Sequence, residues 1–192
     1  MRLMFAAGLL ALATACSPAT PTAEEIKKAS DEINAWFDAE YEEALQMSPI
    51  GLTFQGRKEQ YDKLDQFGDA ELDRQLEWRR ASVAEMKEKF DPAKLNEEAR
   101  TSFDLWAEQL SEAEKSAEFR RAPYVFVKDG PHVFLPNFMM NFHTVSEKSD
   151  MEAYIARLGE MERGLDQVLE TAKLAAAEGN HAPRFAYDQA IQ

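Results

Sequence analysis

The sequence has 192 residues, and its 35 acidic residues outnumber its 22 Lys and Arg residues, which gives a net charge of −13 at pH 7. This charge excludes sequence-independent nucleic-acid binding, which needs a basic face, and it disfavours docking on anionic lipid through basic patches. A hydrophobic content of 45% and an aromatic content of 10% predict a globular chain with a core of its own.

Residues 1–15 have the layout of a secretory signal peptide. Arg2 supplies a positive start, an apolar run follows from Leu3 to Leu12, and small residues, Ala13 to Ala15, precede a cleavage point. The apolar run is shorter than the roughly 20 residues that cross a bilayer. We therefore expect an exported protein whose mature chain starts at residue 16.

Cys16 is the only cysteine of the chain and directly follows these small residues. A thiol at this place can take a thioether-linked diacylglyceryl group, and we predict that Cys16 is the lipidated first residue of a bacterial lipoprotein. The other interpretation is an ordinary cleavage site before a cysteine without a role, because Ala13 stands where lipidation sites usually carry leucine. Residues 16–22 would form a lipidated tether, and the expected location is the bacterial cell envelope, on its periplasmic or outer-membrane face.

The mature chain is predicted to begin with an amphipathic helix. Thr22 and Glu25 form a capping box, which starts a helix that continues to about Met47 and ends before Pro49. Residues 50–68 have no clean period, and we predict an ordered loop with one short helical turn.

Two more helices are predicted before residue 118. Asp69 can cap a helix that ends at about Phe90. Asn96 caps the next helix, in which apolar residues recur at steps of four and three: Ala99, Phe103, Trp106, Leu110 and Ala113. This spacing indicates a helix with one apolar face.

Residues 118–146 break this pattern, because prolines and a glycine interrupt the segment at Pro123, Gly130, Pro131 and Pro136. Residues 124–127 (YVFV) predict a short strand or an extended packed segment. Residues 133–142 (VFLPNFMMNF) form an apolar insert that must be buried, either under the preceding helices or against a partner.

The longest helix is predicted to follow. A second capping box, Ser149 with Glu152, starts it, and it ends at about Glu178, before Gly179. Its predicted inward stripe is Met151, Tyr154, Ile155, Leu158, Met161, Leu165, Val168, Leu169 and Ala172. Pro183 then fits the start of a short helix. We expect an all-α fold over residues 23–192, a layer of long amphipathic helices with one irregular apolar insert, incomplete at the carboxy-terminal end.

The sequence carries no H-E-x-x-H, C-x-x-C, P-loop or G-x-G-x-x-G motif, and its paired carboxylates fall at helix starts or on solvated faces. We therefore assign no catalytic and no metal-binding residue. His132, His143 and His181 fall in separate loops, where backbone or water partners are a stronger interpretation than a shared zinc site. His132 and Asn137 lie in the apolar insert, where they either shape the loop through hydrogen bonds or line a substrate cleft.

Five segments stand in a recognisable order: residues 33–56 (INAWFDAEYEEALQMSPIGLTFQG), residues 95–110 (LNEEARTSFDLWAEQL), the Gly130-Pro131-His132 turn, residues 150–158 (DMEAYIARL) and residues 182–185 (APRF). Together they resemble the bacterial family called domain of unknown function 885, over nearly the whole mature chain. The resemblance implies a large, mostly helical fold around a long cleft, in exported lipoproteins that are similar to zinc metallopeptidases.

The zinc motif of that family, a variant of H-E-x-x-H, lies in its carboxy-terminal half, and no residue here matches it. The resemblance therefore implies that zinc binds only in a catalytic half that is missing from this chain, and that the present residues are the amino-terminal wall of the cleft, inactive alone. The expected partners are that catalytic half, a peptide substrate and a membrane reached through the lipid anchor, with no nucleic acid. The alternative is a stand-alone acidic helical binding lipoprotein that uses its acidic face or residues 133–142.

Overall fold

The computed structural model describes residues 20–191 of the chain. The predicted signal peptide and Cys16 lie outside these residues. The described part is all-α, as predicted, and contains no strand. Its helices are α1 (Ala23–Gln46), α2 (Pro49–Phe54), α3 (Asp69–Lys89), the short 3-10 helix η1 (Pro92–Lys94), α4 (Glu97–Glu118), α5 (Pro131–Asn141), α6 (Lys148–Ala177) and α7 (Arg184–Ile191).

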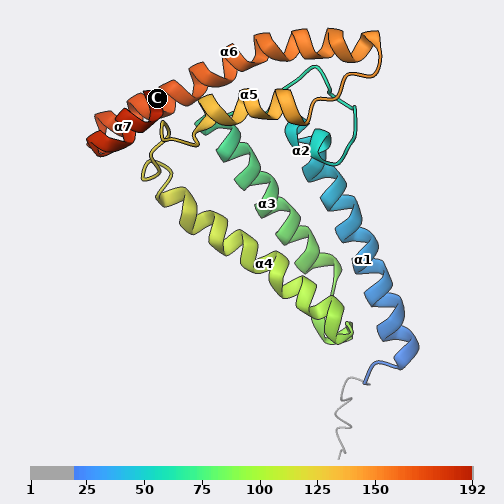
Figure 1. The fold of residues 1–192 in the computed structure, drawn as a ribbon. Coiled ribbons are helices and arrows are strands. Elements are labelled where there is room, and N and C mark those ends of the chain that lie inside the picture. The colour runs from blue at the N-terminus through green and yellow to red at the C-terminus, as the bar shows by residue number, and fades with distance from the viewer. Residues whose placement is uncertain (1–19, 192) are drawn as a thin grey trace, which may run out of the picture.

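These helices form two groups. α1, α3 and α4 make an arm, and α5 and α6 cross over one end of this arm as an upper layer, with α7 beside the last turns of α6 (Figure 1). α2 lies where the arm meets the upper layer (Figure 1). None of the described helices combines the length and the apolar character that crossing a bilayer requires.

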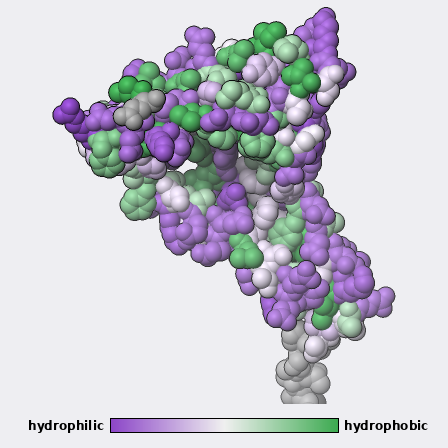
Figure 2. All heavy atoms as spheres, in the orientation of Figure 1, coloured by the Kyte–Doolittle hydropathy of each residue, from purple (hydrophilic) through white to green (hydrophobic). Residues whose placement is uncertain are grey.

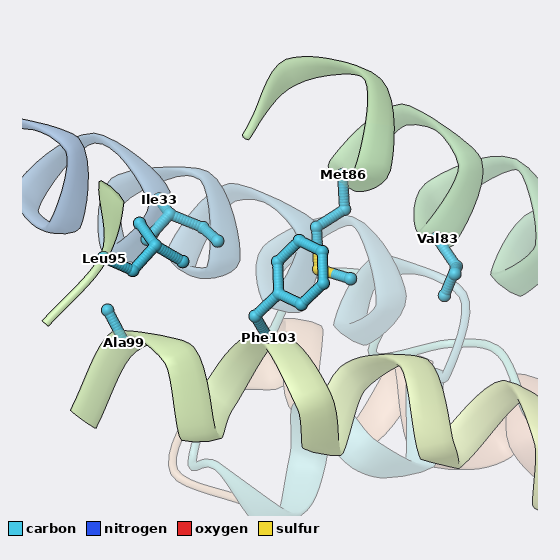
Figure 3. Packing of buried hydrophobic residues seen from close by; sticks show 6 residues of the cluster. All are labelled: Ile33, Val83, Met86, Leu95, Ala99 and Phe103. Atoms are coloured by element: carbon cyan, nitrogen blue, oxygen red, sulfur yellow. The ribbon is translucent and has the colours of Figure 1, made fainter. Parts of the chain in front are cut away.

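The arm has a hydrophobic core of its own, which confirms the apolar faces predicted for its first and third long helices. The buried residues of this core are Ile33, Val83, Met86, Leu95, Ala99 and Phe103 (Figure 3). Trp106 extends it, because its ring centroid lies 6.0 Å from that of Trp36 and 5.4 Å from that of Phe37. The indole N–H of Trp106 donates to Ser82 Oγ at 3.0 Å, so this partly buried ring leaves no donor unpaired.

Several predicted helix ends are confirmed. The Thr22 hydroxyl accepts the backbone N–H of Glu25 at 3.2 Å, and the Asn96 side chain accepts that of Ala99 at 2.8 Å. Gly179 follows the last residues of α6 with a φ of +88°, a left-handed conformation that glycine adopts without strain.

The irregular apolar insert predicted for residues 133–142 is wrong, because these residues form most of α5. Pro131 lies in the first turn, where a missing N–H loses no helical bond, whereas Pro136 removes one inside the helix. Burial outweighs that loss. Leu135, Phe138 and Met139 are at most 2% exposed and pack with Tyr154, Met161 and Leu165 of α6.

Two predicted caps are also wrong, because in each case an earlier residue caps the helix. Gly68 precedes α3, and the Asp69 carboxylate instead accepts from the guanidinium of Arg121 at 2.7 Å. α6 starts two residues earlier than Ser149 would place it, with Glu147 and Asp150 as the reciprocal pair of its capping box.

The remaining expectations were for residues 124–127 and for the last helix. The strand that was one alternative for residues 124–127 does not form, since residues 125–127 lie in bends and residue 124 in irregular backbone. α7 starts at Arg184, directly after Pro183, close to the predicted position.

α6 keeps part of its apolar surface uncovered. Met151, Ile155, Leu158 and Leu169, which were predicted to point inward, are 46%, 62%, 48% and 41% exposed. We call these four residues the bare stripe. α5 and residues 64–67 cover only one side of α6, and its apolar arc is wider than that contact. Figure 2 shows apolar residues at the surface of the upper layer.

Candidate functional site

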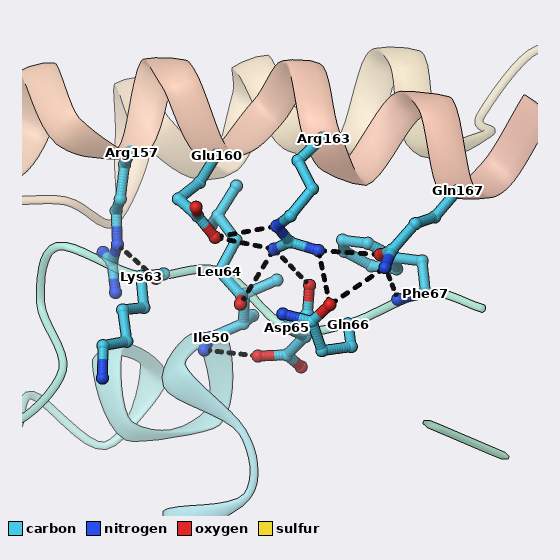
Figure 4. Close-up of polar contacts among 10 residues, drawn as sticks. All are labelled: Ile50, Lys63, Leu64, Asp65, Gln66, Phe67, Arg157, Glu160, Arg163 and Gln167. Atoms are coloured by element: carbon cyan, nitrogen blue, oxygen red, sulfur yellow. Dashed lines mark hydrogen bonds and ion pairs between the residues drawn. The ribbon is translucent and has the colours of Figure 1, made fainter. Parts of the chain in front are cut away.

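A seam of buried polar side chains joins α6 to the segments that precede it, and Arg157 is at its centre. Arg157 is 0% exposed. Its Nε donates to the Lys63 carbonyl at 2.9 Å, as Figure 4 shows. Its Nη2 donates to Thr53 Oγ1 at 2.7 Å and to the Pro49 carbonyl at 3.3 Å. One side chain of α6 therefore holds both α2 and the segment that follows it.

The charge of Arg157 is balanced without a carboxylate, since it forms no ion pair with any described residue. The guanidinium carbon lies 4.7 Å from the ring centroid of Tyr61 and 5.3 Å from that of Phe138, so the two rings add cation–π attraction to the oxygen acceptors. Burial lowers the pKa of Arg157, but an arginine remains protonated at physiological pH.

Arg157 also determines the tautomer of His143. Its Nη1 lies 3.0 Å from His143 Nδ1, and because a guanidinium can only donate, Nδ1 accepts and Nε2 carries the proton. Nε2 then donates to the Asp150 carbonyl at 2.9 Å. The imidazole stacks on Tyr61 with a centroid distance of 4.0 Å. His143 is therefore a neutral side chain whose two nitrogens are both in use.

This arrangement makes the fold sensitive to acid. Burial, assisted by the positive charge of Arg157, lowers the pKa of His143 below its ordinary value of 6.5, although the hydrogen bond to Asp150 opposes the shift. As the pH falls, His143 binds a proton in the unfolded chain before it does so in the folded chain. The contribution of neutral His143 to the free energy of unfolding is therefore present above about pH 6.5 and is lost as the pH falls from there through the lower folded-state pKa.

We accordingly expect the urea midpoint to fall when the pH is lowered from about 7.5 to about 5.5. His143→Gln can still accept from Arg157 and donate to Asp150, so it should lose most of this pH dependence. His181→Gln, at an exposed position, should retain it. Equal pH dependence in wild type and His143→Gln would contradict the assignment.

The amino-terminal end of α6 is fixed by Asp150, which is 2% exposed. Its Oδ1 and Oδ2 accept from Lys58 Nζ at 2.7 and 2.8 Å, and Oδ2 also accepts the backbone N–H groups of Ser146 and Glu147 at 2.8 and 3.1 Å. The Lys58 bond, together with the backbone donors, lowers the pKa of Asp150, and the same pair raises the pKa of Lys58. This ion pair anchors the capping box.

Arg163 and Gln167 continue the seam toward the middle of α6. Arg163 donates to the carbonyls of Leu64 and Asp65 at 3.3 and 3.1 Å, and Gln167 Oε1 accepts the backbone N–H of Phe67 at 2.9 Å (Figure 4). Gly164 lies between them, where an added Cβ would be 2.9 Å from the Phe67 ring. Polar bonds and a close approach therefore fix α6 against residues 64–67.

A shallow trough lies beside this seam, between α6 and the start of α3. Its volume is about 560 Å³. It is lined by Gly68, Asp69, Gly159, Glu162, Arg163, Asp166, Gln167, Glu170, Thr171 and Leu174. Arg157 and His143 at the centre of the seam are buried, whereas this trough, which Arg163 and Gln167 also line, is open and can receive a ligand.

The two candidate cleft residues lie apart from the seam and the trough. His132 is half-buried in the first turn of α5, its ring centroid 5.7 Å from that of Phe126, and its Nδ1 has no hydrogen-bond partner among the described residues. Asn137 is exposed, and its carbonyl accepts from the Asn141 side chain at 2.8 Å. The seam itself was missed, although Asp150 and Arg157 fall seven residues apart on the inward face of the predicted helix.

The described residues do not fit a zinc site. A catalytic zinc needs three protein ligands, and no group of three or more His, Cys, Asp or Glu side chains in residues 20–191 could hold a metal ion. His143 has no free ring nitrogen, so it could not join His132 and His181 as a ligand.

The comparisons with known proteins support the family resemblance from residue 49 onward, while residues 33–48 of the first motif lie outside the match. The family model described as "Bacterial protein of unknown function (DUF885)" matches residues 49–192, which include α2 to α7 and every residue of the seam. No curated protein and no solved structure matches the chain. Because the family model covers well over half of the sequence, the chain belongs to the DUF885 family.

Proposed function

We propose that these helices are a non-catalytic cleft wall in an exported, zinc-metallopeptidase-like protein that is anchored to the bacterial envelope through a lipid on Cys16. Family membership and the resemblance of the motifs support this proposal. The wall contributes binding surface and supplies no zinc ligand. Zinc and the groups that act with it would belong to a catalytic part of the protein that lies outside these residues.

The bare stripe is the observation that carries the proposal. Several exposed apolar side chains on one face of a helix indicate a contact site, whereas single exposed apolar residues are ordinary. The stripe lies on the same upper layer as α7, whose Phe185 and Ile191 are 64% and 84% exposed. We propose that the catalytic part covers this surface, because the seam already holds the opposite side of α6.

A fluorescent apolar dye tests the cleft wall. The mature chain, residues 16–192, should bind the dye when it is folded, and Ile155→Glu should reduce that binding because it places a charge within the stripe. Leu105→Glu is the matched control, since Leu105 of α4 is exposed to a similar degree, 58% against 62%, but lies outside the upper layer. Absence of dye binding, or equal binding by both variants, would contradict the proposal.

The lipid anchor is tested separately. We expect the wild-type precursor to incorporate labelled fatty acid in bacteria and to be recovered with membranes, because two or three acyl chains anchor a protein stably. Cys16→Ser should remain unlabelled and be recovered in the soluble fraction. Ser17→Ala, next to it, should behave as wild type. Labelling of Cys16→Ser would overturn the assignment.

The alternative function, a stand-alone acidic binding lipoprotein, is favoured by one observation. Among residues 20–191, the core of the arm is formed by residues of α1, α3, α4 and the turn before α4 alone. This alternative predicts a single sharp unfolding transition for residues 16–192 and no dye binding by the folded chain.

A further inference from the structure

The trough beside α6 has features that suggest an occupant of defined chemistry. Two glycines, Gly68 and Gly159, lie on it, and a Cβ added to either would meet no atom within 4 Å. Its lining along α6 extends from Gly159 to Leu174, a distance of about 22 Å at the helical rise. The trough is thus an open channel long enough for several residues of a peptide.

One side of the trough is acidic. Glu162, Asp166 and Glu170 follow one another at steps of four residues along α6. Within residues 20–191, neither Glu162 nor Asp166 makes a side-chain hydrogen bond or an ion pair, and only Glu170 has a cation, Lys173 at 2.6 Å. Like charges at this spacing destabilise a helix, so a cationic ligand would relieve their repulsion.

The other charged residues of the trough cannot relieve the repulsion between these carboxylates. Arg163 is committed to Glu160, at 2.8 Å, and to the carbonyls of Leu64 and Asp65. Asp69 is neutralised by Arg121. The unpaired charge that faces a ligand is therefore negative, in a chain whose net charge of −13 also attracts cations over distance.

We propose that this trough binds an extended cationic peptide segment in which Lys or Arg alternates with apolar residues. Four residues of α6 rise about 6 Å, and alternate side chains on one side of an extended chain are about 6.6 Å apart, so basic residues at every second position would face successive carboxylates. The apolar residues between them would point to the other side of the peptide, toward the wall of the trough at Gly68, before α3. This inference deepens the proposed cleft wall, because it names the kind of peptide that the wall holds.

The probe is a fluorescein-labelled heptapeptide, Lys-Leu-Lys-Leu-Lys-Leu-Lys, titrated with the mature chain carrying Cys16→Ser and followed by anisotropy. Binding should weaken as salt is added. Glu162→Gln with Asp166→Asn should weaken it about fivefold or more, because two ion pairs are lost. Glu88→Gln with Glu108→Gln removes the same charge from exposed positions of the arm and should leave binding unchanged.

Variants at Gly159 distinguish binding in the trough from general electrostatic attraction to the acidic chain. Gly159→Phe should obstruct one end of the trough and weaken binding, whereas Gly159→Ala should bind as wild type, and neither side chain meets a neighbour at its Cβ. The inference would be overturned if the peptide did not bind, or if Gly159→Phe bound it as wild type does. It would also be overturned if Glu88→Gln with Glu108→Gln weakened binding as much as the trough variant, or if Lys-Gly-Lys-Gly-Lys-Gly-Lys, which lacks apolar residues, bound equally well. Dye binding at Ile155 reports on the proposed cleft wall independently, so either proposal can fail alone.

Discussion

Arg157→Ala is expected to lower the free energy of unfolding by about 3–5 kcal/mol, because several hydrogen bonds from a buried charged donor are lost and a cavity is left. The substitution leaves the carbonyl of Lys63, Thr53 Oγ1 and Nδ1 of His143 without their donor inside the protein. It also opens a cavity against the rings of Tyr61 and Phe138.

Urea unfolding of the mature chain measures this loss, provided that one transition is seen by two probes. Arg100→Ala is the control, because Arg100 is exposed and forms no ion pair among the described residues, and its effect should stay within about 0.5 kcal/mol. Arg157→Met retains volume but donates nothing, so it should recover only the cavity part of the loss. Full stability of Arg157→Met would show that the hydrogen bonds of the seam contribute nothing.

Phe138→Ala should cost about 3–5 kcal/mol, the usual range for removing a buried phenylalanine. Phe138 is 1% exposed, and its ring contacts Phe54, with a centroid distance of 5.5 Å, and the guanidinium of Arg157. Its loss therefore opens a cavity at the point where α2, α5 and α6 meet.

Met140→Ala is the matched control on the same helix. Met140 lies two residues further along α5 and is 68% exposed, so its removal should change stability by less than about 0.5 kcal/mol. Equal losses for the two variants, measured by thermal or urea unfolding, would mean that α5 is not packed through the face described here.

Both predictions concern parts of the fold that sequence reasoning missed, the seam and α5, whereas the arm was predicted. The arm was predictable because Thr22 and Asn96 are unambiguous caps and because Phe103 and Trp106 belong to a regular apolar period. Local signals and tertiary packing agree there, so the helix boundaries and the buried face follow from the sequence.

α5 was missed because Pro131 and Pro136 were interpreted as interruptions of regular structure. Leu135, Phe138 and Met139 nevertheless have the spacing of a helical face, and their burial against α6 compensates for the bond that Pro136 removes. No local rule gives the strength of that tertiary contact, and propensity is overridden where packing is dense.

The seam was missed for a different reason. An arginine within an apolar stripe is usually expected to extend its charge to solvent, and no local signal shows that Thr53, Lys63 and His143 will surround Arg157. Asp150 and Arg157 on the inward face were the available clue. The sequence also could not show which apolar residues of α6 stay exposed. The hydrophobic period gives the apolar face of a helix but not how much of that face the neighbouring elements cover.

The central claim is that the bare stripe of α6 is open to solvent in this chain and available for a further part of the protein. Cys16 is the only cysteine, so Cys16→Ser gives a thiol-free background into which Ile155→Cys, Leu105→Cys or Val168→Cys can be placed singly. Val168 is 4% exposed and Leu105 is 58% exposed, which sets the two limits for the rate of maleimide labelling of the folded chain. We predict that Ile155→Cys is labelled as fast as Leu105→Cys, and labelling as slow as that of Val168→Cys would contradict the account.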